Sequence, residues 1–494
     1  MSDAASSSSG ETLKEGLQGE LKAVGLVAWP SLAMLMVASV GSIAQLSDSA
    51  SFGLGAVTVY LLPAVLFLLP VGLVSAELAT SHPGGIFVWV RDAFGPRLGF
   101  QATWFSFMNS VTLYPSLLSF GAASLAHALG AQGLSNNGLY MGAVVLVVFW
   151  IATWTVSRGM QSTTWVSNLG LGLGTILPAV TLITLMFIWL GEGRASQIAL
   201  EVADVVPPFD GLSSVALVVG TFVAFAGLEV NAVHIAHMKG PPTAYLKAVL
   251  LAAGTVFTLY LLGSLAISVV VPDSSLELTS GASQAFGVYA EGFGVPALAN
   301  VLSALLVGGA FAASIAWIAG PSRSMWLVGR AGYLPPVLQR TNRNDVQMPL
   351  LLLQGVIVTI LALVFVVSPS TSQAFAILQD ISIALYMLMY LCLFSSAIKL
   401  RRQDPDRYRP IRIRGLVPIS VVGMLAASAA LLLSVTPPAG YSSTPPLVYA
   451  GLVIGGVIVL SLPPSIIRRY RAQRWIDPTD PIAVMTEEES DDGL

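Results

Sequence analysis

Long apolar stretches recur along the whole chain, separated by short polar segments. A helix of about 20 apolar residues crosses the ~30 Å hydrocarbon core of a bilayer. The stretches here are close to or above that length, and they are continuous rather than alternating, as helices that satisfy their own backbone in lipid require. The pattern predicts twelve transmembrane helices, at about 24–46, 53–76, 98–127, 138–156, 168–190, 213–237, 246–272, 297–328, 349–367, 374–399, 416–436 and 446–467.

The composition agrees with a membrane protein. The chain of 494 residues is 55% hydrophobic and only 10% charged, whereas soluble proteins carry about 25% charged residues. No polar segment between the stretches is long enough for a separate domain, so residues 23–470 are expected to form one transmembrane domain. Residues 1–22, which are polar and serine-rich, are predicted to be a disordered arm. Residues 471–494 are predicted to be an acidic tail, either solvated or folded back onto a basic rim.

Lysine and arginine are sorted between alternate loops. With twelve spans both termini lie on one side, and of the 23 basic residues only Arg194 falls on the other side. Because basic residues concentrate in cytoplasmic loops, both termini are predicted to be cytoplasmic, in a cytoplasmic (inner) membrane. The opposite loops carry acidic residues, among which we place Asp48. Glu229 and Asp380 are then the charges expected inside the membrane.

The sequence lacks the motifs of enzymes and of ATP-driven pumps. It has no HExxH, no cysteine–histidine cluster and no Walker loop, and its single cysteine, Cys392, lies within a span. We therefore expect no catalysis, no cofactor, no metal and no nucleic-acid partner. A filter-like repeat or a ring of charge, typical of channels, is also missing. The class that remains is a carrier driven by a gradient of its substrate or of an ion.

Two spans carry a glycine among small residues, where a membrane helix can break. The first span reads MLMVASVGSI at 34–43 and contains Gly41, and the sixth reads TFVAFAGLE at 221–229, with Gly227 just before Glu229. Carriers bind solutes at such breaks, because helix N-termini attract a carboxylate and free carbonyls attract an ammonium. Glycine is also frequent in ordinary membrane helices, so the spacing leaves both interpretations open. The two spans are equivalent if the first ten form a five-plus-five inverted repeat.

Several longer motifs are distinctive. They are GGIFVWVRDAFGPRLGF at 84–100, FAGLEVNAVH at 225–234, VPDSSLEL at 271–278, SIAWIAGPSRSM at 314–325, and the pair Tyr386 and Tyr390. With them, residues 20–470 resemble the amino acid–polyamine–organocation (APC) superfamily, and within it the glutamate/GABA antiporter branch. The resemblance implies an all-α, twelve-helix, LeuT-type fold, with inverted repeats at about 23–190 and 213–400 and two extra helices within 416–467. It also implies alternating-access exchange of amino acids or their decarboxylation products.

Positions that match the branch suggest a substrate pocket. Tyr386 and Tyr390 lie four residues apart on one helix face, where their rings suit an aliphatic or cationic substrate and their hydroxyls its polar end. A packed aromatic stripe is the alternative for the two tyrosines, and a structural hydrogen bond between helices is the alternative for Glu229. The suggested pocket residues are Ser39, Val40, Gly41, Ser42, Ile43, Phe225, Ala226, Gly227, Leu228, Glu229, Trp317, Tyr386 and Tyr390.

The chain departs from the branch at two positions. The branch has an acidic residue four positions before the tryptophan of its eighth span, where this chain has Ala313. It has another acidic residue after its sixth span, where this chain has His237. The loss of two acids predicts a change of substrate, coupling or pH dependence relative to the branch.

Four ionisable residues are candidates for gating or proton coupling. Glu77 ends the second span and either forms a cytoplasmic gate pair with Arg91 or Arg323, or is solvated. Asp380 either binds a cation or proton, or lies at the membrane interface. His234 and His237 share a helix face and either sense pH or pack at a helix end. The four candidates are Glu77, His234, His237 and Asp380.

Together these patterns favour a membrane exchanger of amino acids or amines. It is expected to be a monomer or homodimer, surrounded by membrane lipid, with a small-molecule substrate. A proton-coupled amino acid or polyamine symporter that uses Asp380 is the alternative. A non-transporting sensor is disfavoured, because no soluble domain large enough to signal is present.

Overall fold

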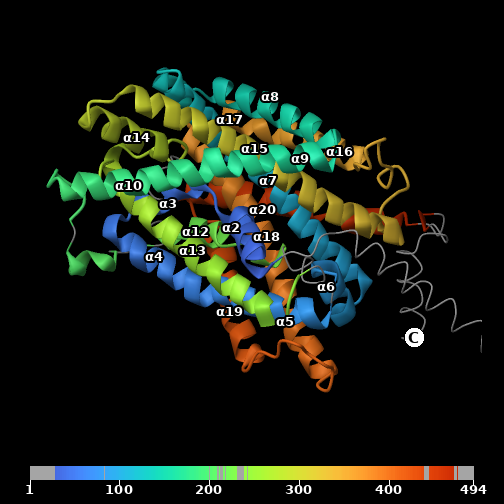
Figure 1. Ribbon diagram of the computed structural model, residues 1–494. Helices are drawn as coiled ribbons and strands as arrows, with labels where there is room; N and C mark the ends of the chain where they lie inside the picture. Colours follow the sequence, from blue (N-terminus) through green and yellow to red (C-terminus); the bar gives the residue numbers. More distant parts are fainter. Residues whose placement is uncertain are drawn as a thin grey trace, which may run out of the picture.

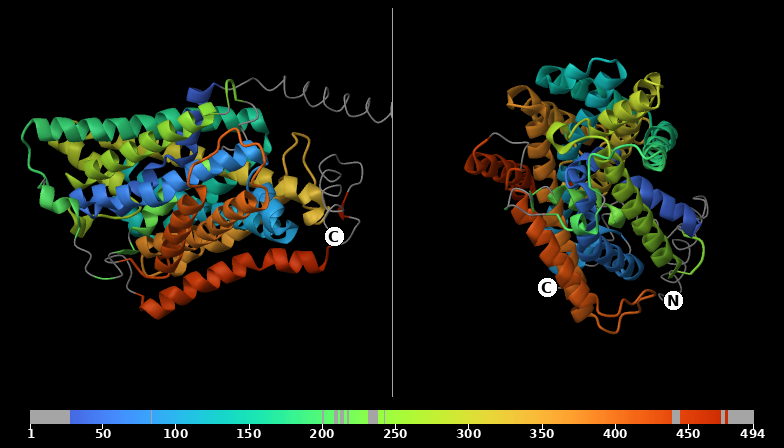
Figure 2. Two further views of the ribbon diagram at one scale, coloured as in Figure 1. Left: turned by 90° about the horizontal axis from the view of Figure 1, so that it is seen from below. Right: turned by 90° about the vertical axis from the view of Figure 1, so that its left-hand side faces the viewer.

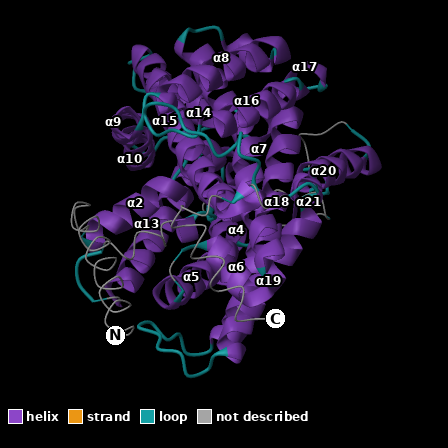
Figure 3. Ribbon diagram, turned by 90° about the vertical axis from the view of Figure 1, so that its right-hand side faces the viewer, coloured by secondary structure: helices purple, strands orange, loops and turns teal. Residues whose placement is uncertain are grey.

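The regular structure of the chain is helical. The computed structural model describes residues 28–82, 84–199, 201–207, 211, 215–216, 218–230, 238–241, 243–438, 444–471 and 475–476, and Figure 3 shows a bundle of helices joined by loops. The predicted arm at 1–22 and residues 477–494 of the predicted acidic tail lie outside the described residues. The predicted all-helical class is therefore confirmed for the part of the chain that can be described.

The helices follow one another with short connections. In chain order they are α2 (Trp29–Val40), α3 (Leu46–Ala50), α4 (Ala56–Pro63), α5 (Leu69–Ser81), α6 (Ile86–Phe94), α7 (Pro96–Ala128), α8 (Gly138–Ser157), α9 (Met160–Gly170), α10 (Leu177–Gly191), α12 (Val219–Ala224), α13 (Thr243–Ser268), α14 (Gly281–Gly292), α15 (Ala297–Val328), α16 (Met348–Ala362), α17 (Val364–Val367), α18 (Thr371–Gln403), α19 (Leu416–Leu433), α20 (Pro446–Ser461) and α21 (Pro463–Arg469).

Among the described residues, nine helical segments are long and apolar enough to cross a membrane. Each coincides with one of the predicted spans. Three of them contain a π-helical segment: Ala64–Leu68 between α4 and α5, Leu171–Ile176 between α9 and α10, and Gly329–Tyr333 after α15. The nine segments are Gly53–Ser81, Gly138–Ser157, Ser162–Gly191, Thr243–Ser268, Ala297–Tyr333, Met348–Val367, Thr371–Gln403, Leu416–Leu433 and Pro446–Arg469.

The other three predicted spans differ from these nine. The span at 98–127 is one continuous helix, α7, of 33 residues. The span at 24–46 is interrupted between Val40, where α2 ends, and Leu46, where α3 begins. The span at 213–237 is also interrupted, because α12 ends at Ala224. Thus the two spans whose glycines indicate a break are the two whose helices stop midway.

The helices pack around two hydrophobic cores. One core contains side chains of α2, α4, α5, α12, α13 and α19, the other contains side chains of α8, α16 and α17, and α7 and α15 contribute to both. The helix α18 contributes side chains to both, such as Tyr386 to the first and Leu385 to the second. Figure 1 shows α8, α15, α16 and α17 on one side of α18 and α4, α5 and α19 on the other. The two cores therefore meet along α7, α15 and α18.

Burial differs strongly between the helices. The most apolar window of α18 is 72% buried inside the protein, whereas that of Pro446–Arg469, which contains α20 and α21, is only 11% buried. Figure 2 shows α20 and α21 along the outside of the bundle. A helix that is apolar on all sides but little covered by protein needs lipid around it. The periphery of this bundle is therefore suited to hydrocarbon, and α18 is its central element.

Candidate functional site

A cavity lies between the two hydrophobic cores, where the interrupted helices face α7 and α15. Its volume is about 120 Å³, measured as the space open to the centre of a water-sized sphere, and a single water needs about 10–15 Å³ of such space. Among the described residues, no side chain that lines the cavity is charged, and the polar ones are few. The lining residues are Val40, Gly41, Ser42, Gln45, Asn109, Leu113, Leu117, Ala224, Ala226, Val230, Ala313, Ala316, Trp317, Gly320, Pro321 and Tyr386.

The first interruption places extended backbone beside the cavity. Gly41 has φ −67° and ψ 112°, and Ser42 has φ −139° and ψ 132°, so neither continues α2. A Cβ atom at position 41 would lie 2.7 Å from the carbonyl oxygen of Val37, which is too close for any residue but glycine. The hydroxyl of Tyr260 on α13 accepts the N–H of Ser42 at 3.0 Å and donates to the carbonyl of Val40 at 2.6 Å. One tyrosine thus satisfies the backbone on both sides of the break.

Two serines on α13 extend this support along the interrupted span. Ser264 donates to the carbonyl of Leu46 at 2.7 Å, and Ser268 donates to that of Ala50 at 2.7 Å. With Tyr260 they are spaced by four residues, so all three hydroxyls lie on one face of α13. Unpaired carbonyls are costly in an apolar interior. This row of hydroxyls was missed in the sequence, although its spacing of four within an apolar span is a readable signal.

The second interruption follows α12. Gly227 has φ +112°, a conformation that L-residues with a side chain rarely adopt. Its N–H donates to the hydroxyl of Tyr390 on α18 at 2.9 Å. As at the first break, a tyrosine from a neighbouring helix forms the hydrogen bond that a backbone group lacks where the α-helix ends.

Glu229 lies just after this break and is only 6% exposed. The hydroxyl of Tyr386 donates to its Oε1 at 2.7 Å, and the hydroxyl of Tyr390 donates to its Oε2 at 2.7 Å. The two rings lie 4.8 Å apart between centroids. The tyrosines are therefore more than an aromatic stripe, since both are hydrogen-bonded to one carboxylate. Tyr386 also lines the cavity, whereas Glu229 and Tyr390 lie behind it.

The structure brings only part of the predicted pocket to the cavity wall. Val40, Gly41, Ser42, Ala226, Trp317 and Tyr386 line it, whereas Ile43, Phe225, Gly227, Leu228, Glu229 and Tyr390 do not. Ser39 lies in α2, and its side chain is outside the described part of the structure.

Two wall positions show what the sequence alone did not reveal. Ala313, where the resembled branch carries an acid, lines the cavity, so that the missing charge would have faced it. Asn109 on α7 was overlooked, although it is a polar residue within an apolar span. Its Oδ1 atom accepts a hydrogen bond of 2.7 Å from Ser382 on α18, which fixes the amide at the wall.

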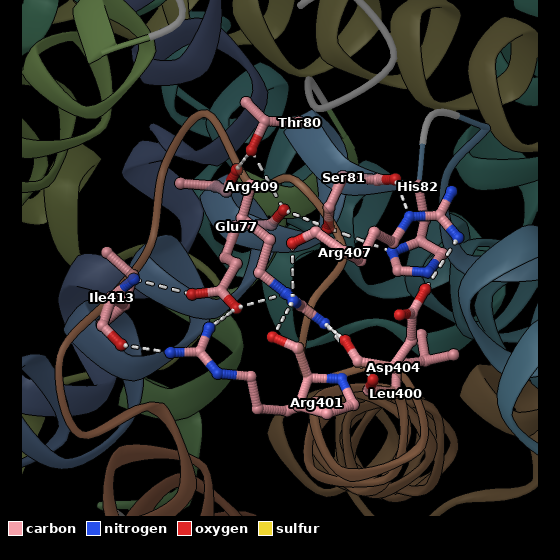
Figure 4. A network of polar contacts seen from close by, with 12 residues as sticks. Glu77, Thr80, Ser81, His82, Leu400, Arg401, Asp404, Arg407, Arg409 and Ile413 are labelled. Atoms are coloured by element: carbon pink, nitrogen blue, oxygen red, sulfur yellow. Dashed lines mark hydrogen bonds and ion pairs between the residues drawn. The ribbon is translucent and has the colours of Figure 1, made fainter.

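A buried ionic cluster joins the far end of α5 to the segment that follows α18 (Figure 4). Glu77, which is 1% exposed, pairs with Arg401, accepts the backbone N–H of Ile413 at 2.7 Å, and lies 3.4 Å from Nε of Arg409. Arg409 also donates to the carbonyl of Asp404 at 2.6 Å. Burial and then the neighbouring Arg401 guanidinium lower the pKa of Arg409, and the Glu77 carboxylate opposes this shift.

The prediction that Glu77 pairs with Arg91 or Arg323 is wrong. Arg91 pairs with Asp92 at 2.9 Å, and Arg323 pairs with Asp345 at 3.1 Å. The reason is topological: the last turn of α18 carries Arg401 beside α5, and the segment that follows α18 brings Arg409 to the same carboxylate. The alternative of a solvated Glu77 is also wrong, because the side chain is buried.

Two further acids are buried toward the opposite end. Asp380 is 9% exposed and accepts a 2.6 Å hydrogen bond from Tyr449 on α20, so it is buried within the protein, and its depth in the membrane stays a prediction. Asp48 was placed in an outer loop, but it lies in α3 and is 3% exposed. Gln379 on α18 donates to its Oδ2 at 2.7 Å. Among the described residues the buried acids are therefore Asp48, Glu77, Glu229 and Asp380, not Glu229 and Asp380 alone.

The two remaining candidates, His234 and His237, lie outside the described residues. Within the described ranges, no group of three or more histidine, cysteine or acidic side chains is arranged to hold a metal ion.

Comparison with known proteins gives consistent matches. The model of the amino acid permease family matches residues 27–459. An uncharacterized transporter of Legionella pneumophila is 34% identical over 440 residues, which cover 88% of this chain and 94% of that protein. A glutamate/gamma-aminobutyrate antiporter of Lactococcus lactis is 28% identical over 340 residues, covering 68% of each chain. A probable agmatine/putrescine antiporter of the same species is 24% identical over 357 residues, covering 71% of this chain and 74% of its own.

The contribution of the Tyr260 hydroxyl to the stability of the first break can be tested directly. We expect Tyr260→Phe to lower the apparent melting temperature in detergent, because it removes both hydrogen bonds that hold Val40 and Ser42, at a cost of roughly 1–3 kcal/mol. Tyr245→Phe is the matched control on the same helix, since the hydroxyl of Tyr245 is buried without a hydrogen-bond partner among the described residues. Equal melting temperatures for the two variants would show that the Tyr260 hydroxyl does not stabilise the break.

Proposed function

Because this chain belongs to the amino acid permease family, we propose that it exchanges amino acids or amines across a membrane by alternating access. The membership confirms the resemblance to the APC superfamily that its motifs indicated. The observation that carries the proposal is the position of the two breaks: Gly41 and Ser42 of one, and Ala226 of the other, line the same uncharged cavity.

An amino acid suits such a cavity for an electrostatic reason. The part of the wall that the structure describes offers no lysine or arginine to a carboxylate and no acid to an ammonium. The charged ends of the substrate would instead meet backbone dipoles at the interrupted helices, where N–H and C=O groups are not all used within a helix. A site built in this way tolerates a zwitterion, because it pairs neither end with a permanent countercharge.

We assign different roles to the two tyrosines of α18. The hydroxyl of Tyr390 donates to Glu229 and accepts from Gly227, so its role is to position the second break. The hydroxyl of Tyr386 donates to Glu229, and its oxygen keeps free acceptor capacity at the cavity wall. Tyr386 is therefore the member of the pair that would contact the substrate, by accepting a hydrogen bond from its ammonium.

The proposed topology has twelve crossings, with both termini cytoplasmic in an inner membrane. The nine apolar segments, the 33-residue helix α7 and the two interrupted spans together make up this number. The interrupted spans are the first and the sixth, which supports inverted repeats at about 23–190 and 213–400. Because α19 and α20 follow both repeats, and α20 lies at the periphery, we assign them as the extra helices.

Counterflow in liposomes tests the exchange itself. Purified protein is reconstituted with an unlabelled amino acid or amine inside, and uptake of the same labelled compound is measured from outside. We expect internal substrate to accelerate uptake, because the loaded carrier returns through the membrane faster than the empty one. If none of a panel of amino acids and amines stimulates uptake from inside, the exchange proposal is wrong.

The role of Tyr386 can be separated from its place in the fold. We expect Tyr386→Phe to raise the half-saturation concentration for exchange about tenfold, since a hydrogen bond to a charged group contributes roughly 1.5–3 kcal/mol. Tyr140→Phe is the matched control, because the hydroxyl of Tyr140 donates only to the carbonyl of Ala122 on the distant side of α7. An unchanged half-saturation concentration in Tyr386→Phe would remove this tyrosine from the site.

Proton-coupled symport is the second candidate, and the buried pair of Asp380 and Tyr449 favours it. A carboxyl group held in an apolar interior is a common proton carrier in transporters. If the protein is a symporter, an imposed proton gradient drives uptake into liposomes without internal substrate, and Asp380→Asn abolishes that uptake. If it is an exchanger, Asp380→Asn leaves counterflow within about twofold of the native protein. Asp345→Asn, at an exposed pair, is the control for either outcome.

A further inference from the structure

The carboxylate of Asp48 is buried without a countercharge. It lies in α3, and the described residues place no lysine, arginine or histidine against it. Its Oδ2 accepts the amide of Gln379, and its Oδ1 has no hydrogen-bond partner among the described residues. Burying a charge is costly unless it is paired and fully hydrogen-bonded. Asp48 is thus only half satisfied.

Two more buried acceptor oxygens of this region are also unpartnered. One is Oε1 of Gln379, in the amide group that donates to Asp48, and the other is Oε1 of Gln45, in the 3₁₀ segment Ile43–Gln45 that leads directly into α3. The two glutamines are 6% and 7% exposed, so bulk water does not reach these atoms freely. Amide oxygens and the oxygens of an ionised carboxylate can only accept, so with Asp48 ionised these three atoms require a donor or a cation.

The neighbouring helix leaves room for this arrangement. Gly220 on α12 faces the carboxylate, and a Cβ atom there would collide with Oδ2 of Asp48 and lie 3.2 Å from Nε2 of Gln379. The group is therefore enclosed by three elements: α3 and α12, which belong to the two interrupted spans, and α18.

One member of the polar group, Gln45, reaches the cavity, whereas Asp48 and Gln379 lie behind the wall. Gln45 lines the cavity and also shares a helical turn with Asp48. On α18, Gln379 precedes Tyr386 by seven residues, which places the two on one face about 10 Å apart along the axis. A ligand that contacts Tyr386 at one end and Asp48 at the other would have the length of an extended diamine or basic amino acid.

We propose that Asp48, Gln379 and Gln45 form a binding site for one monovalent cationic group at the outer end of the cavity. The cation is either the terminal ammonium of a substrate or a sodium ion, since both are bound by carboxylate and amide oxygens. This inference rests on the proposed transport function, because the site would determine which substrates the cavity binds.

Binding can be measured without transport. The thermal unfolding of the purified protein in detergent is recorded with 1,4-diaminobutane, with 1-aminobutane, and with sodium chloride against N-methylglucamine chloride at equal ionic strength. A ligand that binds only the folded protein raises its melting temperature. We expect a rise of several degrees with the diamine or with sodium, and the compound that acts identifies the source of the cation.

Substitutions test whether this rise in melting temperature comes from the proposed cation site. Asp48→Asn keeps the shape of the side chain and removes its charge, so the rise should disappear. Gln45→Leu leaves the charge of Asp48 in place and should reduce the affinity for the cation at least fivefold. This second variant replaces Asp48→Asn as the test if gel filtration shows that Asp48→Asn does not fold. Asp345→Asn, at an exposed pair, should respond as the native protein does.

The proposal is overturned if neither the diamine nor sodium stabilises the native protein. It is equally overturned if Asp48→Asn and Gln45→Leu respond as the native protein does. Because counterflow is measured separately, an exchanger without this site would still show stimulated uptake, whereas a cation site in a protein that does not exchange would show only the thermal shift.

Discussion

Two transmembrane segments stop being helical inside an apolar bundle, and the rest of the structure depends on how their backbone is satisfied. A broken helix leaves N–H and C=O groups that hydrocarbon cannot pair. The hydroxyl of Tyr260 on α13 hydrogen-bonds the backbone at the break around Gly41 and Ser42, and the hydroxyl of Tyr390 on α18 hydrogen-bonds the backbone at Gly227. Each tyrosine both donates and accepts a hydrogen bond. Because side chains of other helices satisfy this backbone, the interrupted segments can line a cavity without leaving these backbone groups unpaired.

The two breaks are held in similar ways but with different partners. Tyr260 bonds only backbone, on either side of the first break. Tyr390 bonds one backbone N–H and one carboxylate, that of Glu229, which Tyr386 bonds as well. The second break therefore has an ionisable group within its support, and one member of that support, Tyr386, faces the cavity. A substrate that competes for the Tyr386 hydroxyl would act on the geometry of the second break.

The helix α18 links these elements along its whole length. Near its start, Gln379 and Asp380 bond Asp48 of α3 and Tyr449 of α20. In its middle, Ser382 bonds Asn109 of α7, and the tyrosine pair bonds Glu229. Near its end, Arg401 pairs with Glu77 of α5. A helix that is bonded to both hydrophobic cores can transmit a change at the cavity to either end, and each buried acid in the described chain lies against α18 or the segment that follows it.

The sequence by itself determined the class, nine of the spans and the two glycine breaks, because apolar length and the conformational freedom of glycine are local properties. It also located six residues of the cavity wall through their motifs. Only the tertiary structure decided the partners of the buried groups. Asp48 and Gln379 are 331 residues apart, and Glu77 and Arg401 are 324 apart. A local pattern cannot show such pairs, because packing, not the length of an apolar stretch, decides whether a charge at the end of a span is exposed or buried against another helix.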